Sequence, residues 1–428
     1  MARMPLIGEP YWWATAPRPA VEPGPPAPRV DVAVIGGGCT GLAAARRLAA
    51  GGARVAVFEQ EAIGAGASSR NGGQVLTGLT LDTATLLARY GRERAGALFQ
   101  ASLDAIDALE RLIAQEAIDC GFVRCGHLEA AVKASHVDAL ARERDQLARE
   151  FGHEVRLVPR SDVSTELGSE AYHGLLVDER SARLHPAQYV YGLAGAARRA
   201  GAALHERTAV RRIDADGDRL RLETTQGVVS AAEVIVATNG YTGAATPALR
   251  RRLVAVGSYM LATEPLSRAE ADRLLPRRRV VYESRVLLHY FQLAPDRRLL
   301  FGGRATFAPA SPRSERASAA VLLRDLRGLF PQLRDLQPAY VWGGNVAIAR
   351  DRMPHAGRLG RLHYAAGYGG HGLALSTTLG DVIGRRLLGE PAGHPLLEAP
   401  FRPFPLYRGR AWFLPAVSAW YRLLDRLS

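Results

Sequence analysis

Hydrophobic and small residues recur in the same order near both ends of the chain. Residues 31–59 form an apolar run, a glycine turn, a small-residue helix and a second apolar run that ends at Glu59. Residues 362–389 repeat the order of strand, glycine turn and helix. Units of this kind are typical of the parallel sheet of a doubly wound α/β fold. The pattern therefore predicts one α/β domain whose parts lie about 300 residues apart in sequence.

The region between these two units alternates helical and strand patterns. Helices are expected at 82–117, 136–151, 187–200 and 315–329, with a break near Gly91 and Gly96 in the first. Strands are expected at 203–205, 208–213, 219–224 and 227–229, followed by one that ends in Ala237-Thr238-Asn239-Gly240 and returns to the parallel sheet. Residues 250–345 show period-two alternation around the last helix, which predicts a separate substrate lobe.

These elements divide the chain into alternating parts of two domains. The cofactor domain is expected at 30–120, 186–249 and 351–398, and the substrate domain at 121–185 and 250–350. Residues 1–29 form an N-terminal extension, whose aromatic cluster Tyr11, Trp12 and Trp13 should dock on the body and whose last part is proline-rich. Residues 399–428 form a basic, aromatic tail, which we expect to pack on the body rather than to contact a membrane surface.

Composition narrows the class of protein. The 428 residues exceed one usual hydrophobic core, and 47% hydrophobic with 23% charged residues is ordinary for a globular enzyme. Arginines interrupt every apolar stretch before it could cross a bilayer, and no secretory signal is apparent, so a cytoplasmic location is expected. Three cysteines predict neither a disulfide framework nor a metal site.

The net charge of +13 does not indicate a protein that binds nucleic acid. Lys133 is the only lysine among 55 basic residues, and the arginines are scattered rather than clustered with aromatic residues. Nucleic acid is therefore not expected as a partner.

The first glycine turn carries the clearest binding signal. Gly36 permits the turn out of the strand, Gly38 lets the backbone approach a pyrophosphate, and Gly41 lets helix and strand pack closely. Glu59 can accept hydrogen bonds from ribose hydroxyls and would repel the 2'-phosphate of NADP. Cys39, Thr40 and Gln60 are further expected cofactor contacts.

Two distant segments favour a flavin over a nicotinamide. In residues 63–75 no helix or strand pattern fits, and glycines should let the chain run extended past a ribityl group, with contacts from Ser68, Ser69, Arg70, Asn71, Gly72, Gly73 and Gln74. At the second turn, a helix N-terminus would approach the flavin ring through Gly367, Gly370, His371, Gly372 and Leu373. Val210, Ala237, Thr238 and Asn239 complete the expected FAD contacts.

The motifs YWWATA, VIGGGCTGLAAARRLA, IGAGASSRNGGQV, ATNGY, RLLFGGR and GYGGHGLALSTTLG together cover nearly the whole chain. In these motifs the chain resembles the D-amino acid oxidase superfamily of FAD-dependent oxidoreductases, and more closely its gamma-glutamylputrescine oxidoreductase-like branch. The resemblance implies an α/β Rossmann-like FAD-binding domain that carries a mixed or antiparallel-sheet substrate domain. It also implies hydride transfer from a carbon bearing nitrogen to the flavin, which gives an imine that water hydrolyses.

The chain departs from relatives at three kinds of position. Val346 and Gly370 stand where glycine-oxidase-like members place carboxylate-binding arginines, so a small α-amino acid is less expected than an amine or a larger substrate. No cysteine follows Cys125, so the FAD should be non-covalent. The single lysine lies outside every cofactor motif, which leaves Arg70, His371 or Arg350 as candidate positive charges near the ring.

The expected pocket residues come from the substrate lobe and the second turn. By alternation Tyr290 and Gln292 point one way, toward the flavin, and His289 and Phe291 the other. Trp342 and His371 are the remaining candidates.

Three functions stay open on this basis. The first is an FAD-dependent oxidoreductase acting on an amine, like gamma-glutamylputrescine oxidase. The second is an N-methyl amino-acid or D-amino-acid dehydrogenase that passes electrons to an acceptor other than dioxygen. The third is a flavin-binding subunit without catalysis.

Overall fold

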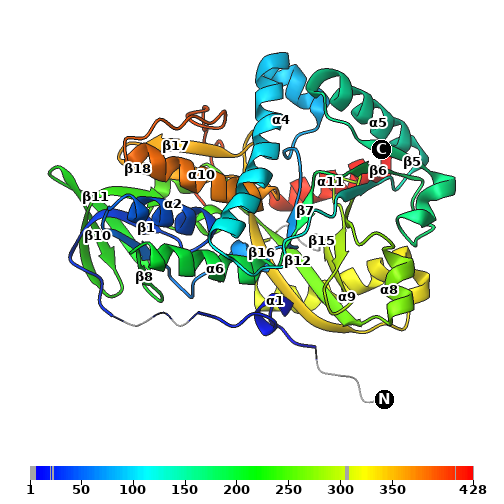
Figure 1. The fold of residues 1–428 in the computed structure, drawn as a ribbon, viewed down its shortest axis with the longest axis horizontal. Helices are drawn as coiled ribbons and strands as arrows, with labels where there is room; N and C mark the ends of the chain where they lie inside the picture. The colour runs from blue at the N-terminus through cyan, green and yellow to red at the C-terminus, as the bar shows by residue number, and fades with distance from the viewer. Residues whose placement is uncertain (1–5, 20, 22–23, 304–307, 410, 428) are drawn as a thin grey trace.

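Two eight-stranded sheets organise the molecule (Figure 1). The computed structural model describes residues 6–19, 21, 24–303, 308–409 and 411–427, the last six as backbone only. The first sheet runs β17-β18-β11-β1-β2-β8, with β10 and β9 added beside β11. Its strands are β1 (Arg29–Ile35), β2 (Val55–Phe58), β8 (Ala203–His205), β9 (Val210–Asp216), β10 (Arg219–Thr224), β11 (Gly227–Val236), β17 (His355–Leu359) and β18 (Leu362–Ala366).

The centre of this first sheet is parallel, as its apolar strands predict. Strand β1 pairs in parallel with β2 and β11, β2 with β8, and β11 with β18. The strand predicted to end at residues 237–240 joins the one expected at 227–229 to form β11. The sheet is thus assembled from segments far apart in sequence.

The second sheet has the order β16-β12-β15-β14-β13-β4-β6-β5. It is antiparallel except for the parallel pair of β4 and β13. Its strands are β4 (His127–Ala130), β5 (Arg156–Pro159), β6 (Gly174–Asp178), β12 (Leu253–Pro265), β13 (Val280–Glu283), β14 (Tyr290–Leu293), β15 (Arg298–Gly303) and β16 (Pro338–Ala349). Strands β3 (Gln74–Val75) and β7 (Ala182–Arg183) form a separate pair.

Helices surround and join the sheets. They are α1 (Tyr11–Ala14), α2 (Cys39–Ala50), α3 (Ala67–Arg70), α4 (Thr83–Gln115), α5 (Ala134–Gln146), α6 (Pro186–Arg199), α7 (Pro247–Arg250), α8 (Arg268–Leu274), α9 (Pro312–Leu329), α10 (Gly372–Leu387) and α11 (Leu414–Leu427). Asp82 caps α4 by accepting a hydrogen bond of 2.7 Å from the Thr85 amide. The expected break falls at Gly91, which has φ 73°, whereas Gly96 continues the helix.

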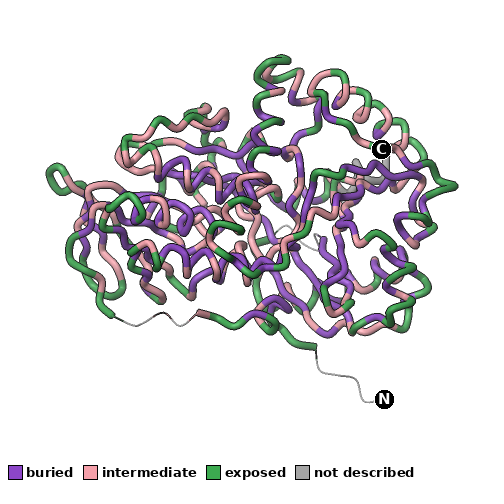
Figure 2. The backbone as a smooth tube through the Cα atoms, viewed as in Figure 1, coloured by how far each residue is buried: buried purple, intermediate pink, exposed green. Residues whose placement is uncertain are grey.

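The core has separate clusters beneath the two sheets. Figure 2 shows buried backbone concentrated on the strands. Beneath the second sheet, Phe291, Phe301 and Phe330 are fully buried, and helices α8 and α9 close the cluster. As alternation predicts, Phe291 and His289 face this core, where both lie against Phe301.

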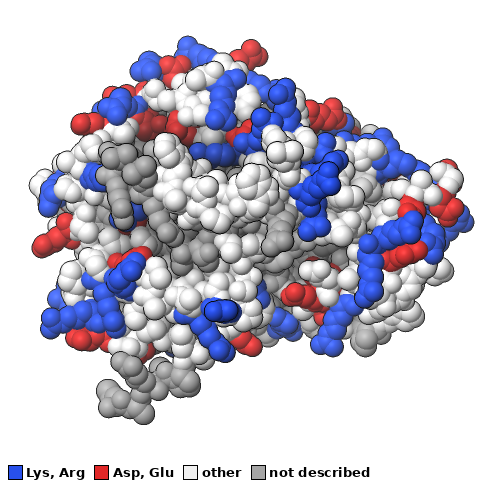
Figure 3. Space-filling model, turned by 180° about the vertical axis from the view of Figure 1, so that it is seen from behind, with Lys and Arg blue, Asp and Glu red and all other residues white. Residues whose placement is uncertain are grey.

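Both ends of the described chain contact the body of the protein. In α1, Tyr11 and Trp12 are buried. In the tail, Tyr407 and Leu414 cover Val254 and Val256 of β12. No helix among the described residues is long and apolar enough to cross a membrane. On the face seen in Figure 3, basic side chains are interspersed with acidic ones and form no single stripe.

The segment 63–75 differs from the extended loop that the sequence predicts. It contains helix α3 and strand β3. The Asn71 side chain donates to the carbonyls of Ala67 and Ser68, each over 3.0 Å, and so closes the helix. A helix of four residues is too short to show a helical hydrophobic period, which is why the pattern missed it.

Candidate flavin and substrate site

One large cavity of about 1200 Å³ lies between the two sheets. Its lining combines the glycine turns of the first sheet with side chains from β4, β6, β13 and β14 of the second. Single-ligand pockets usually measure about 300–1000 Å³. The volume therefore leaves room for a dinucleotide and a second small molecule.

The first turn is shaped by close backbone packing. Gly36 has φ 108°, and a Cβ there would lie 2.8 Å from the carbonyl oxygen of Ala237. A Cβ at Gly41 would overlap the carbonyl oxygen of Gly36, so helix α2 can approach β1 only with glycine at this position. The Cys39 amide donates to Oγ of Ser68 over 3.0 Å, which ties the turn to the segment 63–75.

Glu59 stands at the carboxyl end of β2, beside the first turn. Its carboxylate accepts hydrogen bonds from the amides of Gly37, at 2.8 Å, and Glu61, at 3.0 Å. Burial raises the pKa of this carboxyl, although the backbone donors oppose that shift. Glu59 lines the cavity, so its carboxylate can accept from ribose hydroxyls there.

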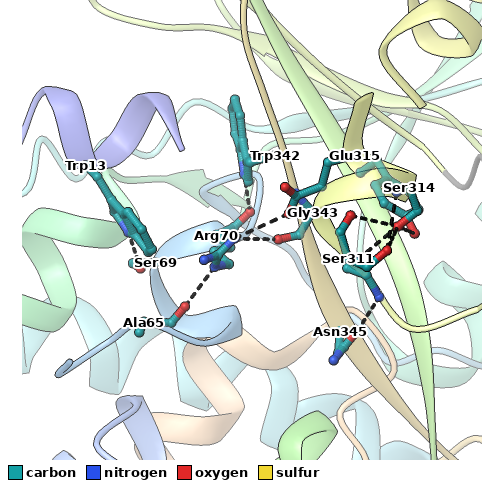
Figure 4. Close-up of polar contacts among 12 residues, drawn as sticks. Trp13, Ala65, Ser69, Arg70, Ser311, Ser314, Glu315, Trp342, Gly343 and Asn345 are labelled. Carbon is teal, nitrogen blue, oxygen red and sulfur yellow. Dashed lines mark hydrogen bonds and ion pairs between the residues drawn. The ribbon is translucent and has the colours of Figure 1, made fainter. Parts of the chain in front are cut away.

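Arg70 fastens the segment 63–75 to the second sheet (Figure 4). Its guanidinium donates to the carbonyls of Ala65, at 2.8 Å, and Gly343, at 3.0 Å, and lies 3.7 Å from the Glu315 carboxylate. The indole of Trp342 donates to the Arg70 carbonyl over 2.8 Å. These contacts hold the Arg70 guanidinium in place, and Arg70 also lines the cavity, so it stays a candidate positive charge there.

Helix α1 covers the other side of this segment. The Trp13 indole donates to Ser69 Oγ over 2.7 Å and also lies 4.6 Å from the Arg70 guanidinium, measured to the ring centre. The Trp12 indole donates to the Asn71 carbonyl over 2.8 Å. The aromatic cluster near the N-terminus therefore holds the expected ribityl-binding segment in place.

The second glycine turn is joined to the end of β11. The amide of Gly367 donates to Oδ1 of Asn239 over 2.9 Å. His371 is the N-cap of α10 and lines the cavity. Burial lowers the pKa of His371 to about 4, so its imidazole is neutral near pH 7. Arg350 is exposed and does not line the cavity, so neither residue supplies the predicted positive charge.

Most residues predicted to contact FAD line this one cavity. They are Gly36, Gly38, Cys39, Thr40, Glu59, Gln60, Ser68, Arg70, Asn71, Gly72, Gln74, Val210, Ala237, Thr238, Asn239, Gly370, His371, Gly372 and Leu373. Gly41, Ser69, Gly73 and Gly367 do not line it. Instead, Gly41 serves helix packing, and Ser69 is fully buried, donating to the Gly64 carbonyl over 2.6 Å.

The four predicted pocket residues separate into two groups. Tyr290 and His371 line the cavity. Gln292 is buried behind it and donates to the Gly72 carbonyl. Trp342 is buried, and its indole donates a hydrogen bond to the carbonyl of Arg70. Neither Gln292 nor Trp342 reaches the cavity, because each is engaged in holding the segment 63–75 against the second sheet.

No sequence motif predicted the part of the cavity wall that strands β4, β6 and β13 of the second sheet form. His127, Glu129 and Asp178 line the cavity together with Tyr282. Their strands β4, β6 and β13 are separated by up to 150 residues, so no local motif links them. The only sequence signal was polar residues inside otherwise apolar strands. Among the described residues, no group of three or more metal-ligating side chains is close enough together to hold a metal ion.

The cavity offers features that fit a flavin dinucleotide. Thr80 Oγ1 and His371 Nδ1 are buried atoms without a hydrogen-bond partner among the described residues, and both residues line the cavity. Such atoms cost free energy unless a ligand pairs with them. Residues around Gly36 and Glu59 would hold the adenosine half, and those of the second turn the flavin half.

A parallel dinucleotide-binding sheet joined to an antiparallel sheet over one shared cavity defines the class of two-domain flavoprotein oxidoreductases. The chain belongs to the FAD dependent oxidoreductase (DAO) family, which residues 31–386 match. Its cofactor is therefore FAD, and it is an amine or amino-acid oxidoreductase.

Individual relatives are similar over most of their length. The chain is 33% identical over 402 residues to the gamma-glutamylputrescine oxidoreductase of Escherichia coli K12, covering 93% of each chain. It is 32% identical over 366 residues to the probable oxidoreductase OrdL of Haemophilus influenzae, covering 84% of this chain and 83% of that one. The crystal structure of glycine oxidase from Geobacillus kaustophilus superposes with a TM-score of 0.75 at 24% identity, covering 89% and 100%.

Proposed function

We propose that the enzyme oxidises the C–N bond of an amine of the gamma-glutamylputrescine type rather than that of a small α-amino acid. The observation behind the proposal is the charge of the cavity wall. Val346 and Gly370 both line the cavity and present no cationic group. By contrast, three carboxylates of the second sheet line the same cavity, those of Glu129, Asp178 and Glu283. A wall of this kind favours a cationic amine over a carboxylate.

The arginines that line the cavity are engaged or distant. Arg70 is held by backbone carbonyls, and Arg285 is paired with Glu283 at 3.0 Å. Arg211 follows Val210 on β9, at the Glu59 end of the cavity. Within the described residues, none offers the two-pronged guanidinium that a substrate carboxylate needs near the second turn. Arg304, the last residue of the RLLFGGR motif, lies outside the described residues.

The chemistry divides between cofactor and protein. When bound, FAD supplies the hydride acceptor, and the protein orients the substrate and excludes water. Tyr290 is placed to shape the wall, because its hydroxyl is held 3.0 Å from Ser258 Oγ and a Cβ on Gly72 would lie 3.0 Å from its ring. An amine that arrives neutral needs no protein base for hydride loss, and the imine product is hydrolysed by water.

A second candidate concerns the electron acceptor. Lys133 lies at the N-cap of α5 and does not line the cavity, and His371 is neutral. A positive charge near the flavin helps dioxygen accept electrons, because it stabilises the negative charge that forms. Because neither Lys133 nor His371 supplies such a charge, an acceptor other than dioxygen is the second candidate.

Product analysis tests the proposed reaction. Each reaction contains holoenzyme, a dye acceptor and one substrate, which is gamma-glutamylputrescine, putrescine, sarcosine, glycine or a D-amino acid. We expect one equivalent of aldehyde and one of ammonia per two electrons from the amines, with little product from glycine. Turnover only with α-amino acids would overturn the proposal. Peroxide yield without dye separates the two acceptor classes.

A further inference from the structure

We propose that Glu129 binds a second cationic group of the substrate, remote from the bond that is oxidised. The enzyme then selects amines that carry a distal ammonium or guanidinium group. This inference rests on the proposed amine oxidation and assigns a specificity residue to the same cavity.

The position of Glu129 follows from strand register. Tyr290 of β14 pairs with Tyr282 of β13, and Tyr282 pairs with Glu129 of β4. All three residues line the cavity. Neighbouring strands lie about 4.8 Å apart, so Glu129 is about 10 Å from Tyr290 along this row. An extended chain covers that distance in about eight single bonds.

Glu129 differs from the other acids around it. Its Oε2 accepts one long hydrogen bond, 3.3 Å from the Tyr282 hydroxyl. Within the described part of the chain, its Oε1 has no hydrogen-bond or ion-pair partner. Burial raises the pKa of Glu129 to about 7, as expected for a carboxyl that the protein itself does not neutralise.

The protein holds the neighbouring carboxylates with shorter hydrogen bonds than the one to Glu129. Asp178 accepts from Thr77 Oγ1 over 2.6 Å and lies 2.8 Å from Nε2 of His153. Glu143 accepts from the Thr83 amide over 3.2 Å. Among the described residues, Oε1 of Glu129 and Oε2 of Glu143 accept no hydrogen bond, so the cluster is not simply a self-contained network of side chains.

The surroundings suit a chain that ends in a cation. Leu140 and Leu176 line the cavity beside Glu129, and Leu176 pairs with it across β4 and β6. These side chains can cover methylene groups. The ring of Tyr282, stacked on His127 at 5.2 Å, lines the cavity next to the carboxylate, and aromatic rings attract ammonium and guanidinium groups. The ligand class is therefore an aliphatic amine with a cationic far end.

Calorimetry on holoenzyme with chemically reduced flavin tests the inference, because this form cannot oxidise the amine and reports binding alone. The probes are an aliphatic monoamine and the α,ω-diamine of the same chain length. We expect the wild type to bind the diamine at least about tenfold more tightly, E129Q to bind both equally, and the surface control E170Q to keep the preference. The exposed Glu170 does not line the cavity.

Equal affinity of the wild type for both amines, or a preference that survives in E129Q, would overturn the role of Glu129. Because the assay requires no turnover, this failure differs from failure of the proposed function, which would leave oxidised flavin unreduced by every amine. An FAD content equal to that of the wild type and a melting temperature no lower than that of the wild type confirm that a lost preference does not arise from misfolding of E129Q.

Discussion

The indole of Trp342 donates a hydrogen bond of 2.8 Å to the backbone carbonyl of Arg70, and this contact joins the segment 63–75 to the second sheet. Trp342→Phe removes the donor and leaves a buried carbonyl without it. Such a loss costs about 1–3 kcal/mol. We expect the Kd for FAD to rise about tenfold, measured by fluorescence on titration of apoprotein.

The matched control for this change is Trp412→Phe. Trp412 is 67% exposed and lies in the C-terminal tail, away from the cavity. Its substitution should leave FAD affinity unchanged. An unchanged Kd in Trp342→Phe would show that the segment 63–75 does not depend on this contact.

The carboxyl of Glu129 should make stability depend on pH. Burial raises its pKa from 4.5 to about 7, so the folded protein keeps a proton that the unfolded chain has lost. The groups that act on it are Glu143, Tyr282 and Asp82, and His127, Asp178 and His136 line the same cavity. Glu129 therefore lowers the free energy of unfolding as the pH rises. This destabilisation is absent below pH 4.5, grows between pH 4.5 and 7, and is complete above pH 7.

E129Q removes this titration while keeping the shape of the side chain. Without substrate, E129Q and the wild type should have the same free energy of unfolding at pH 4.5. At pH 8 the value for E129Q should be higher by about 1–3 kcal/mol, which is less than the full pKa shift would give because water in the cavity screens the carboxylate. Melting curves of the two holoenzymes across this range measure the difference. A constant difference at all pH values would contradict the assignment.

A second pH effect comes from His185, the N-cap of α6. Its Nδ1 accepts from the Gln188 amide over 3.2 Å, and burial lowers its pKa to about 4. The unfolded chain therefore gains a proton below pH 6.5 that the folded state resists until about pH 4, and stability is lost across that window.

His185→Asn keeps a capping acceptor but cannot titrate. Between pH 6.5 and 4 it should lose about 2 kcal/mol less stability than the wild type, as measured by urea unfolding. Parallel pH curves for the two proteins would show that His185 is not a source of the acid sensitivity.

The flavin should be released intact by acid precipitation. Cys39 lines the cavity, but burial raises the pKa of its thiol to about 11, so it is not a nucleophile near neutral pH. No cysteine follows Cys125 in the sequence. All yellow colour is expected in the supernatant, and flavin retained in the protein pellet would indicate a covalent bond.

The residues that we expect to bind the cofactor could be predicted from the sequence because their signals are local. Gly36, Gly41 and Glu59 lie in one strand-turn-helix-strand unit, in which spacing determines geometry. The turn at His371 follows the same rule. Alternation also placed Tyr290 on the cavity side of β14 and Phe291 on the core side.

The substrate half depends on pairing between distant strands. Glu129 reaches the cavity because β4 joins β13 in parallel, a contact between residues about 150 positions apart. No pattern in either strand encodes that pairing. The same limit explains Gln292 and Trp342. Alternation predicted the side of the strand for Gln292, but whether Gln292 and Trp342 meet ligand or backbone depends on the segment 63–75.

Anaerobic titration of the oxidised holoenzyme tests the central claim most directly. Gamma-glutamylputrescine, added in substoichiometric steps, should bleach the visible flavin absorbance in proportion, with complete reduction at one equivalent, while glycine at the same concentrations leaves the spectrum unchanged. Bleaching by glycine but not by the amine, or by neither gamma-glutamylputrescine nor any other amine, would contradict the assignment of this enzyme to amine oxidation.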